Sequence, residues 1–175
     1  FKDEYIGRVI ISEDIPDWWS EAINSTGYYL CYFFVRLFDK KYKKSKSQIS
    51  KLNEFFLPFL KNNSYSAQMG KITLAHYLHF FFSGVDEEWT KNNIIPLFDW
   101  TINKQDALQS WQAYLYAGTW SKNLFEDLLS LHKKTFNHFK GLGESRDNYC
   151  QHVAGFTLYS VIFAKEDPLK TGWLR

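Results

Sequence analysis

The fold is decided by residues 94–117, IIPLFDWTINKQDALQSWQAYLYA, which predict the end of one helix, a tight corner and the start of the next. Asn103 suits the N-cap of the second helix, and Asp106 would lie near the positive end of its dipole. Apolar residues then recur at spacings of one, three and four and form one stripe: Ala107, Leu108, Trp111 and Leu115. Two helices joined by so short a corner pack antiparallel, and neither buries its stripe alone. The stretch therefore predicts stacked helical hairpins.

The same periodicity predicts helices on both sides of this corner, and strand signals are sparse. We expect helices over residues 16–38, 49–60, 66–84, from 86 to the corner, from 121 to about 140, over 147–164, and from 167 onward. Residues 1–15 carry some strand-like residues and stay unassigned. The prediction is one all-α domain over residues 1–175.

Two stretches of the sequence share a layout that indicates an internal repeat. Residues 55–78 and 93–116 each place a proline between apolar pairs, then a polar corner, then a helix begun by alanine. Pro58 and Pro96 are 38 residues apart, and the two alanines are 40 apart. A period near forty with two helices per unit is typical of HEAT-like and armadillo-like solenoids. Three small residues would let neighbouring helices approach closely: Gly27, Gly70 and Ser110.

Composition narrows the function classes without naming one. The net charge of +2 is too small to argue for nucleic acid or an anionic membrane, and the longest apolar run, residues 28–35, is too short to span a bilayer. Cys31 and Cys150 have no patterned spacing, so a reducing cytoplasm is the default compartment. The chain begins at Phe1 and stops shortly after a helix start at Asp167, so we expect a fragment of a longer protein.

The sequence carries no recognisable catalytic or cofactor motif, and we expect neither an enzyme nor a cofactor. His76 and His79 could share a metal, but catalytic zinc helices usually space the pair by four with an intervening Glu, so helix packing is the commoner role. The basic run KKYKKSK, residues 40–46, could contact phosphate, although a solvated loop is also expected there.

Four tryptophans recur about every eleven residues: Trp89, Trp100, Trp111 and Trp120. Such a series could form a ligand cage, but in helical repeats tryptophan is more often a core residue between helices. We therefore expect Trp111, together with Leu74 on an equivalent stripe, to be buried between helices of successive units.

The block PLFDW (96–100), followed by Ala107, Trp111 and YLYAG (114–118), resembles the helical C-terminal domain of unknown function of bacterial sirtuin-like antiphage defence proteins. A looser similarity extends over most of the chain, through residues 22–27, 86–89, 152–156 and 172–175. In such proteins the sirtuin-like part consumes NAD, and the helical part is thought to sense or scaffold. Nothing in this chain matches a sirtuin NAD site. The resemblance implies a regulatory module that contacts a partner.

The leading hypothesis is a non-catalytic sensor or scaffold of a cytoplasmic bacterial protein that regulates an effector by protein–protein contact. The partner would be an effector domain of the same chain or a phage-derived trigger, and self-association is also expected. Such contacts gain most from aromatic anchors, for which the candidates are Tyr114, Tyr116 and Trp120. Two alternatives stay open: a nucleic-acid-contacting solenoid using residues 40–46 and Lys133–Lys134, and a metal-dependent hydrolase using His76 and His79.

Overall fold

The computed structural model describes residues 15–117, 119, 121–162 and 167. All secondary structure within these residues is helical, which confirms the predicted all-α class. The elements in chain order are α1 (Trp18–Ile23), α2 (Thr26–Lys41), α3 (Gln48–Leu60), α4 (Tyr65–His76), α5 (Leu78–Gly84), α6 (Glu87–Asn93), the 3-10 helix η1 (Ile95–Phe98), α7 (Lys104–Ala117), α8 (Lys122–Asn137), the 3-10 helix η2 (Phe139–Ser145) and α9 (Arg146–Ile162). The helix expected after Asp167 lies outside the described residues.

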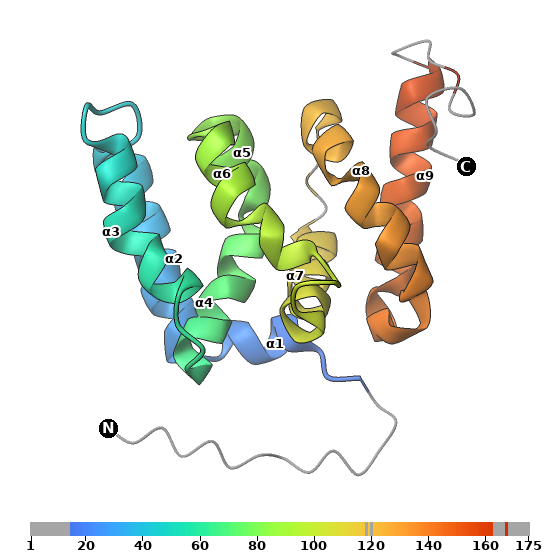
Figure 1. Cartoon of the computed structure of the whole chain (residues 1–175), viewed down its shortest axis with the longest axis horizontal. Coiled ribbons are helices and arrows are strands. Elements are labelled where there is room, and N and C mark those ends of the chain that lie inside the picture. The colour runs from blue at the N-terminus through green and yellow to red at the C-terminus, as the bar shows by residue number, and fades with distance from the viewer. Residues whose placement is uncertain (1–14, 118, 120, 163–166, 168–175) are drawn as a thin grey trace.

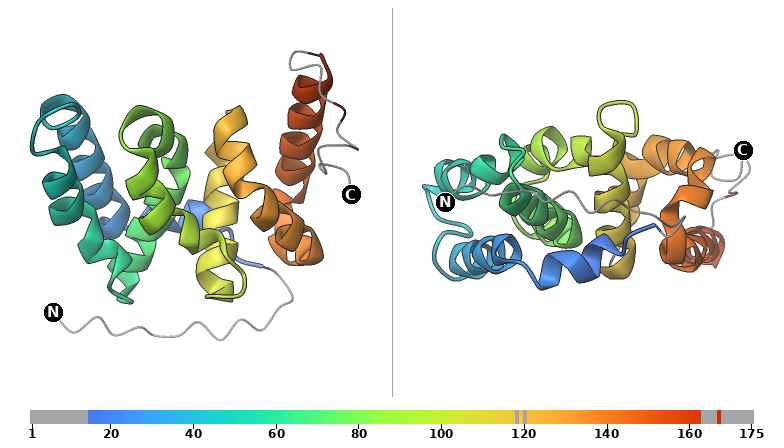
Figure 2. Two further views of the ribbon diagram at one scale, coloured as in Figure 1. Left: turned by 45° about the horizontal axis from the view of Figure 1, so that its top comes forward. Right: turned by 90° about the horizontal axis from the view of Figure 1, so that it is seen from below.

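The helices stand side by side in a row (Figure 1). The α2–α3 pair lies at one end of the row, α8 and α9 lie at the other, and α4 to α7 lie between them. Seen along the helices, α3 and α8 lie on one side of the row and α2 and α9 on the other (Figure 2). The short helix α1 crosses the foot of the row and contacts α2, α4 and α7.

The helix predicted after Asn103 and the helices expected from residues 86 and 121 each begin with a side-chain cap. The Asn103 side chain accepts hydrogen bonds from the backbone N–H groups of Gln105 (3.0 Å) and Asp106 (3.2 Å) at the start of α7. Asp86 accepts from the Trp89 N–H at 2.7 Å at the start of α6. Ser121 caps α8 in the same way. Each bond satisfies a helix-end donor that would otherwise lack a partner.

Two stretches that were each predicted as one helix contain two helices in the structure, so both predictions were wrong in this respect. The expected helix over residues 16–38 ends at Ile23, and Ser25 begins α2 by accepting a hydrogen bond from the Tyr28 N–H at 3.1 Å. The expected helix over residues 66–84 starts earlier, at Tyr65, and is interrupted at Tyr77, where ψ is 16°. In both places the chain bends so that aromatic side chains of α1 and α4 meet.

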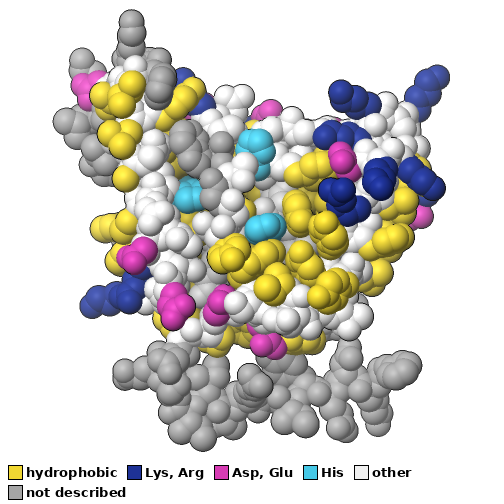
Figure 3. Space-filling view, turned by 180° about the vertical axis from the view of Figure 1, so that it is seen from behind, with side chains coloured by type: hydrophobic (Ala, Val, Ile, Leu, Met, Phe, Trp, Pro, Cys, Tyr) yellow, Lys and Arg dark blue, Asp and Glu magenta, His cyan; other side chains and the backbone are white. Residues whose placement is uncertain are grey.

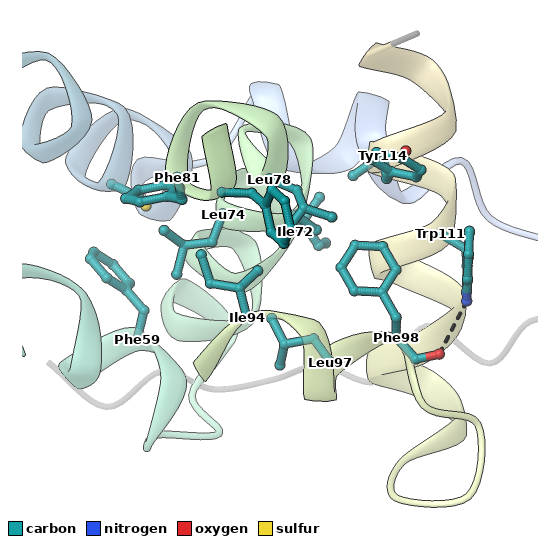
Figure 4. Packing of buried hydrophobic residues seen from close by; sticks show 14 of the residues in the cluster. Phe59, Ile72, Leu74, Leu78, Phe81, Ile94, Leu97, Phe98, Trp111 and Tyr114 are labelled. Carbon is teal, nitrogen blue, oxygen red and sulfur yellow. Dashed lines mark hydrogen bonds between the residues drawn. The ribbon is translucent and has the colours of Figure 1, made fainter. Parts of the chain in front are cut away.

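The corner at residues 94–103 closes the core between α4 and α7. The indole N–H of Trp111 on α7 donates a hydrogen bond to the carbonyl oxygen of Phe98, the last residue of η1, at 3.1 Å (Figure 4). This bond attaches α7 to the segment that precedes it. Trp111 and Leu74 are fully buried, which confirms that both are core residues. Their place between successive repeat units stays a prediction. Lys71 of α4 and Asp106 of α7 form a largely buried ion pair at 3.2 Å between the same two helices.

The three tryptophans of the series that the structure describes are core residues. Each also donates its indole N–H to another element, as buried tryptophans usually do. Trp89 donates to the Asn53 side chain of α3 at 2.9 Å, and Trp100 donates to the Thr135 hydroxyl of α8 at 2.8 Å. The fourth, Trp120, lies outside the described residues.

Gly27 allows α2 and α4 to approach each other closely. A Cβ atom at Gly27 would clash with the backbone carbonyl of Ser66, so no larger residue fits without a shift of one helix. A Cβ at Gly70 would instead clash with the Phe59 ring of α3. Two of the small residues expected at helix contacts, Gly27 and Gly70, therefore lie at such contacts.

Candidate functional site

One face of the row carries a continuous array of aromatic rings, which we call the tyrosine face. It is formed by α1, α2, the α4–α5 junction and the end of α7, and its connected rings are those of Trp19, Tyr28, Tyr29, Tyr32, His76, Tyr77 and Tyr116. The exposed Phe33, one turn from Tyr29 on α2, is counted with the tyrosine face, although its ring contacts Phe34 and none of these rings. Hydrophobic side chains gather over this half of the molecule, beneath a group of Lys and Arg side chains (Figure 3).

Trp19 anchors the array at the foot of the row. Its ring is buried and stacks on His76, with centroids 4.0 Å apart and planes 15° apart. Tyr116 of α7 lies against the same ring at 5.5 Å, and Tyr28 of α2 meets it edge-on at 5.9 Å. Residues from four different elements thus form one surface.

Helix α2 supplies most of the exposed part. Tyr28 and Tyr32 are one turn apart and lie nearly parallel, with centroids 5.8 Å apart, and Tyr32 stacks in turn on Tyr77 at 6.0 Å. Tyr29 and Phe33, also one turn apart, are 61% and 59% exposed. The opposite side of α2 is buried in the core. Large apolar side chains therefore remain exposed to solvent on this helix after folding is complete.

The hydroxyl groups of Tyr28 and Tyr77 stay protonated at neutral pH. Burial raises the pKa of Tyr77 to about 12, with the neighbouring Tyr28 and Tyr32 adding to the shift. Burial also raises the pKa of Tyr28. These side chains therefore present O–H groups that donate and accept hydrogen bonds at the edge of an apolar surface, a combination that is typical of protein contact sites.

The predicted contact residues divide between surface and core. Tyr116 is 63% exposed and belongs to the tyrosine face. Tyr114 is 1% exposed and packs against Phe98, so its proposed role as an exposed contact was wrong. Residues two apart on a helix point to different sides, so the two tyrosines cannot share a face. Tyr29 and Phe33 are exposed residues that the sequence analysis missed.

In the described part of the chain, His76 and His79 do not group with a third side chain that could ligate a metal. The Nδ1 atom of His76 lies 3.3 Å from the Ala113 carbonyl oxygen, and burial lowers the pKa of this imidazole, so it is neutral at pH 7. Among the described residues, no three His, Cys, Asp or Glu side chains group in a way that could hold a metal ion. The two histidines instead line a cavity of about 440 Å³, at the edge of the tyrosine face.

A second, larger cavity of about 800 Å³ opens on the other side of the corner. Apolar side chains dominate its walls, among them Trp18, Trp100, Leu108, Phe136 and Phe139. The Trp100 ring stacks on His138 at 4.3 Å and forms part of the wall.

The two basic regions lie toward opposite ends of the row. Residues 40–46 connect α2 to α3 at one end, whereas Lys133 and Lys134 are on the last turns of α8, toward the other (Figure 1). Lys134 is also paired with Asp99 at 3.1 Å. The two regions thus do not combine into one phosphate-binding track within the described part of the chain.

Comparisons with known proteins add no relative. No protein-family model matches the chain, and neither the curated proteins nor the solved structures yield a significant match. Within the described residues, no helix has both the length and the apolar character needed to cross a membrane.

Proposed function

We propose that this chain is a non-catalytic sensor or scaffold module that binds a protein partner through the tyrosine face. The observation that carries the proposal is the exposure of Tyr29 and Tyr116 in one ring array, with the exposed Phe33 one turn from Tyr29 on the same helix. Interfaces are enriched in tyrosine, tryptophan and arginine, and tyrosine gives a large contact area at low cost in side-chain entropy. Arg36, an exposed residue of α2 whose charge acts on Tyr77, adds arginine to the favoured residue types on this helix.

The helical arrangement supports this proposal. We assign the row of antiparallel helices to the HEAT-like or armadillo-like class, whose stacked units offer long surfaces to partners. The resemblance of PLFDW and YLYAG to the helical domains of sirtuin-like defence proteins suggests the partner: an effector domain of the same protein, or a phage-derived trigger, in the bacterial cytoplasm. The chemistry would then belong to the effector.

The test compares a double variant on the face with an equally exposed pair outside it. Tyr29→Ser with Phe33→Ser should abolish triggering of the effector, measured as NAD loss in phage-challenged cells that carry the complete gene. Ile102→Ser with Leu158→Ser removes side chains that are 68% and 59% exposed elsewhere, and should leave triggering intact. Neither pair should change the free energy of unfolding by more than about 0.5 kcal/mol per site, as is usual for surface positions.

Normal triggering in the Tyr29/Phe33 variant would count against the tyrosine face as the contact surface. NAD cleavage by residues 1–175 alone would count against a non-catalytic module. Equal loss in both variant pairs would show that the effect is not specific to this face.

A further inference from the structure

The cavity of about 440 Å³ joins the tyrosine face to the basic α2–α3 connection. It is lined by Lys43, His76, Tyr77, His79, Phe80, Ser83, Gly84, Ala117 and Thr119. His76 and Tyr77 belong to the tyrosine face, and Lys43 belongs to the basic connection. A partner bound to the tyrosine face would therefore cover the mouth of this cavity.

Lys43 is held at the cavity wall by the packing around it. Its ammonium group lies 4.9 Å from the centre of the Phe80 ring, and Gly84 leaves room for the lysine chain beside α5. The Gln48 side chain donates to the Val85 carbonyl oxygen at 2.9 Å, which fixes the start of α3 against the end of α5. The position of Lys43 is thus set by two elements.

The chemistry of the lining favours an anion. It offers the Lys43 ammonium group, the His79 imidazole and three hydroxyl groups, and among the described residues that line it none is acidic. His76 is not counted as a donor to a ligand, because its Nδ1 atom faces the Ala113 carbonyl oxygen. The ion pair that Lys43 makes with Asp39 is 3.3 Å long and near the surface. Such pairs contribute little, so a ligand carboxylate can replace Asp39.

Charge around the cavity would draw the same kind of ligand. Residues 36–46 contain six basic side chains and one acidic side chain, whereas the chain as a whole has a net charge of +2. The other residues therefore sum to −3, and the positive charge is concentrated beside this cavity. A field of this kind steers an acidic partner toward the site and orients it.

We propose that the cavity receives a carboxylate side chain of a protein partner whose contact segment is acidic. This inference rests on the proposed function, because the same partner would lie on the tyrosine face. A protein is favoured over nucleic acid because the second basic region is toward the far end of the row. A nucleic-acid strand needs a continuous basic track along its backbone.

The experiment is a selection from a random peptide display library on immobilised residues 1–175, followed by affinity measurement of the selected peptides. The selected sequences should be enriched in Asp and Glu, and Lys43→Met should weaken their binding about tenfold, as expected for one charged hydrogen bond. Lys133→Met removes the same charge from an exposed position on α8 and should change the affinity less than about twofold. His79→Gln is a second cavity variant that keeps a hydrogen-bonding side chain.

The possible outcomes separate the two proposals. Selected peptides that lack acidic residues but lose binding in the Tyr29/Phe33 variant would overturn the carboxylate inference and leave the tyrosine face in place. Acidic peptides weakened equally by Lys43→Met and Lys133→Met would also overturn it, since binding would then follow net charge alone. If no peptide is enriched while a single-stranded oligothymidylate binds, both proposals fail and the nucleic-acid alternative stands.

Discussion

Replacing His132 with phenylalanine should make the protein more stable and less sensitive to acid. His132 is 3% exposed, and its ring stacks on Phe125 at 4.6 Å and meets Trp111 at the same distance. Within the described part of the chain, neither ring nitrogen has a hydrogen-bond partner. An unpaired buried polar group costs about 1–3 kcal/mol, so His132→Phe, which keeps a ring of similar size, should raise the free energy of unfolding by about that amount at pH 7.

The acid sensitivity follows from the pKa of the same group. Burial lowers the pKa of His132 to about 3, and the nearby His152 adds to the shift. In an unfolded chain the histidine pKa is about 6.5. As pH falls below that value, the unfolded state binds a proton that the folded state does not, so stability present above pH 6.5 is lost toward pH 3. At about 1.36 kcal/mol per pKa unit, His132 alone should remove about 2–3 kcal/mol between about pH 7 and 4.5.

Urea unfolding followed by far-UV circular dichroism, between about pH 7.5 and 4.5, measures both effects. The His132→Phe protein should be the more stable at pH 7 and should lose less stability on acidification. His138→Phe, which changes a half-buried histidine stacked on Trp100, serves as the control for replacing a histidine ring by phenylalanine elsewhere in the protein. Parallel pH profiles for the wild type and His132→Phe would refute the reasoning.

Three further predictions concern packing. Trp111→Ala should lower the free energy of unfolding by about 3–5 kcal/mol in the same urea assay, because it empties a fully buried site and leaves the Phe98 carbonyl without its donor. Gly27→Ala should cost at least about 1–3 kcal/mol through its clash with α4, whereas Gly155→Ala, where a Cβ meets nothing within 4 Å, should not destabilise the protein. The exposed apolar side chains at the end of α9, among them Ile162, should cause concentration-dependent association in sedimentation experiments, and Ile162→Lys should reduce it.

The sequence predicted the fold well where the deciding contacts are short in range. The caps at Asn103, Asp86 and Ser121 act on N–H groups within three residues, so the local sequence contains all the information needed. The break between α4 and α5 at Tyr77 has no such local marker, since the residues directly before it, Ala75 and His76, are neither glycine nor proline. It accompanies the stacking of His76 on Trp19, a residue far away in the sequence, and periodicity carries no information about such a contact.

The tyrosine face was only partly predictable for a related reason. Residues 28–34, YYLCYFF, place apolar side chains all round α2, so the pattern does not tell which side is buried. The close approach of Gly27 to Ser66 decides this, and it leaves Tyr29 and Phe33 exposed. On α7, the choice between Tyr114 and Tyr116 depends on how the helix is rotated against Phe98. Which side of α2 is exposed, and which of the two tyrosines on α7 is exposed, both depend on how two helices pack against each other.

The hydrogen-bonded indole N–H groups of Trp89, Trp100 and Trp111 can serve as natural spectroscopic reporters. Trp89 reports on the junction of α6 and α3, Trp100 on the attachment of the corner to α8, and Trp111 on the link between α7 and η1. Indole N–H protons exchange with deuterium only when their hydrogen bonds open, so three NMR signals would follow three junctions separately. If the helices separate one junction at a time, the three exchange rates will differ; if the row opens as a unit, they will converge on one value.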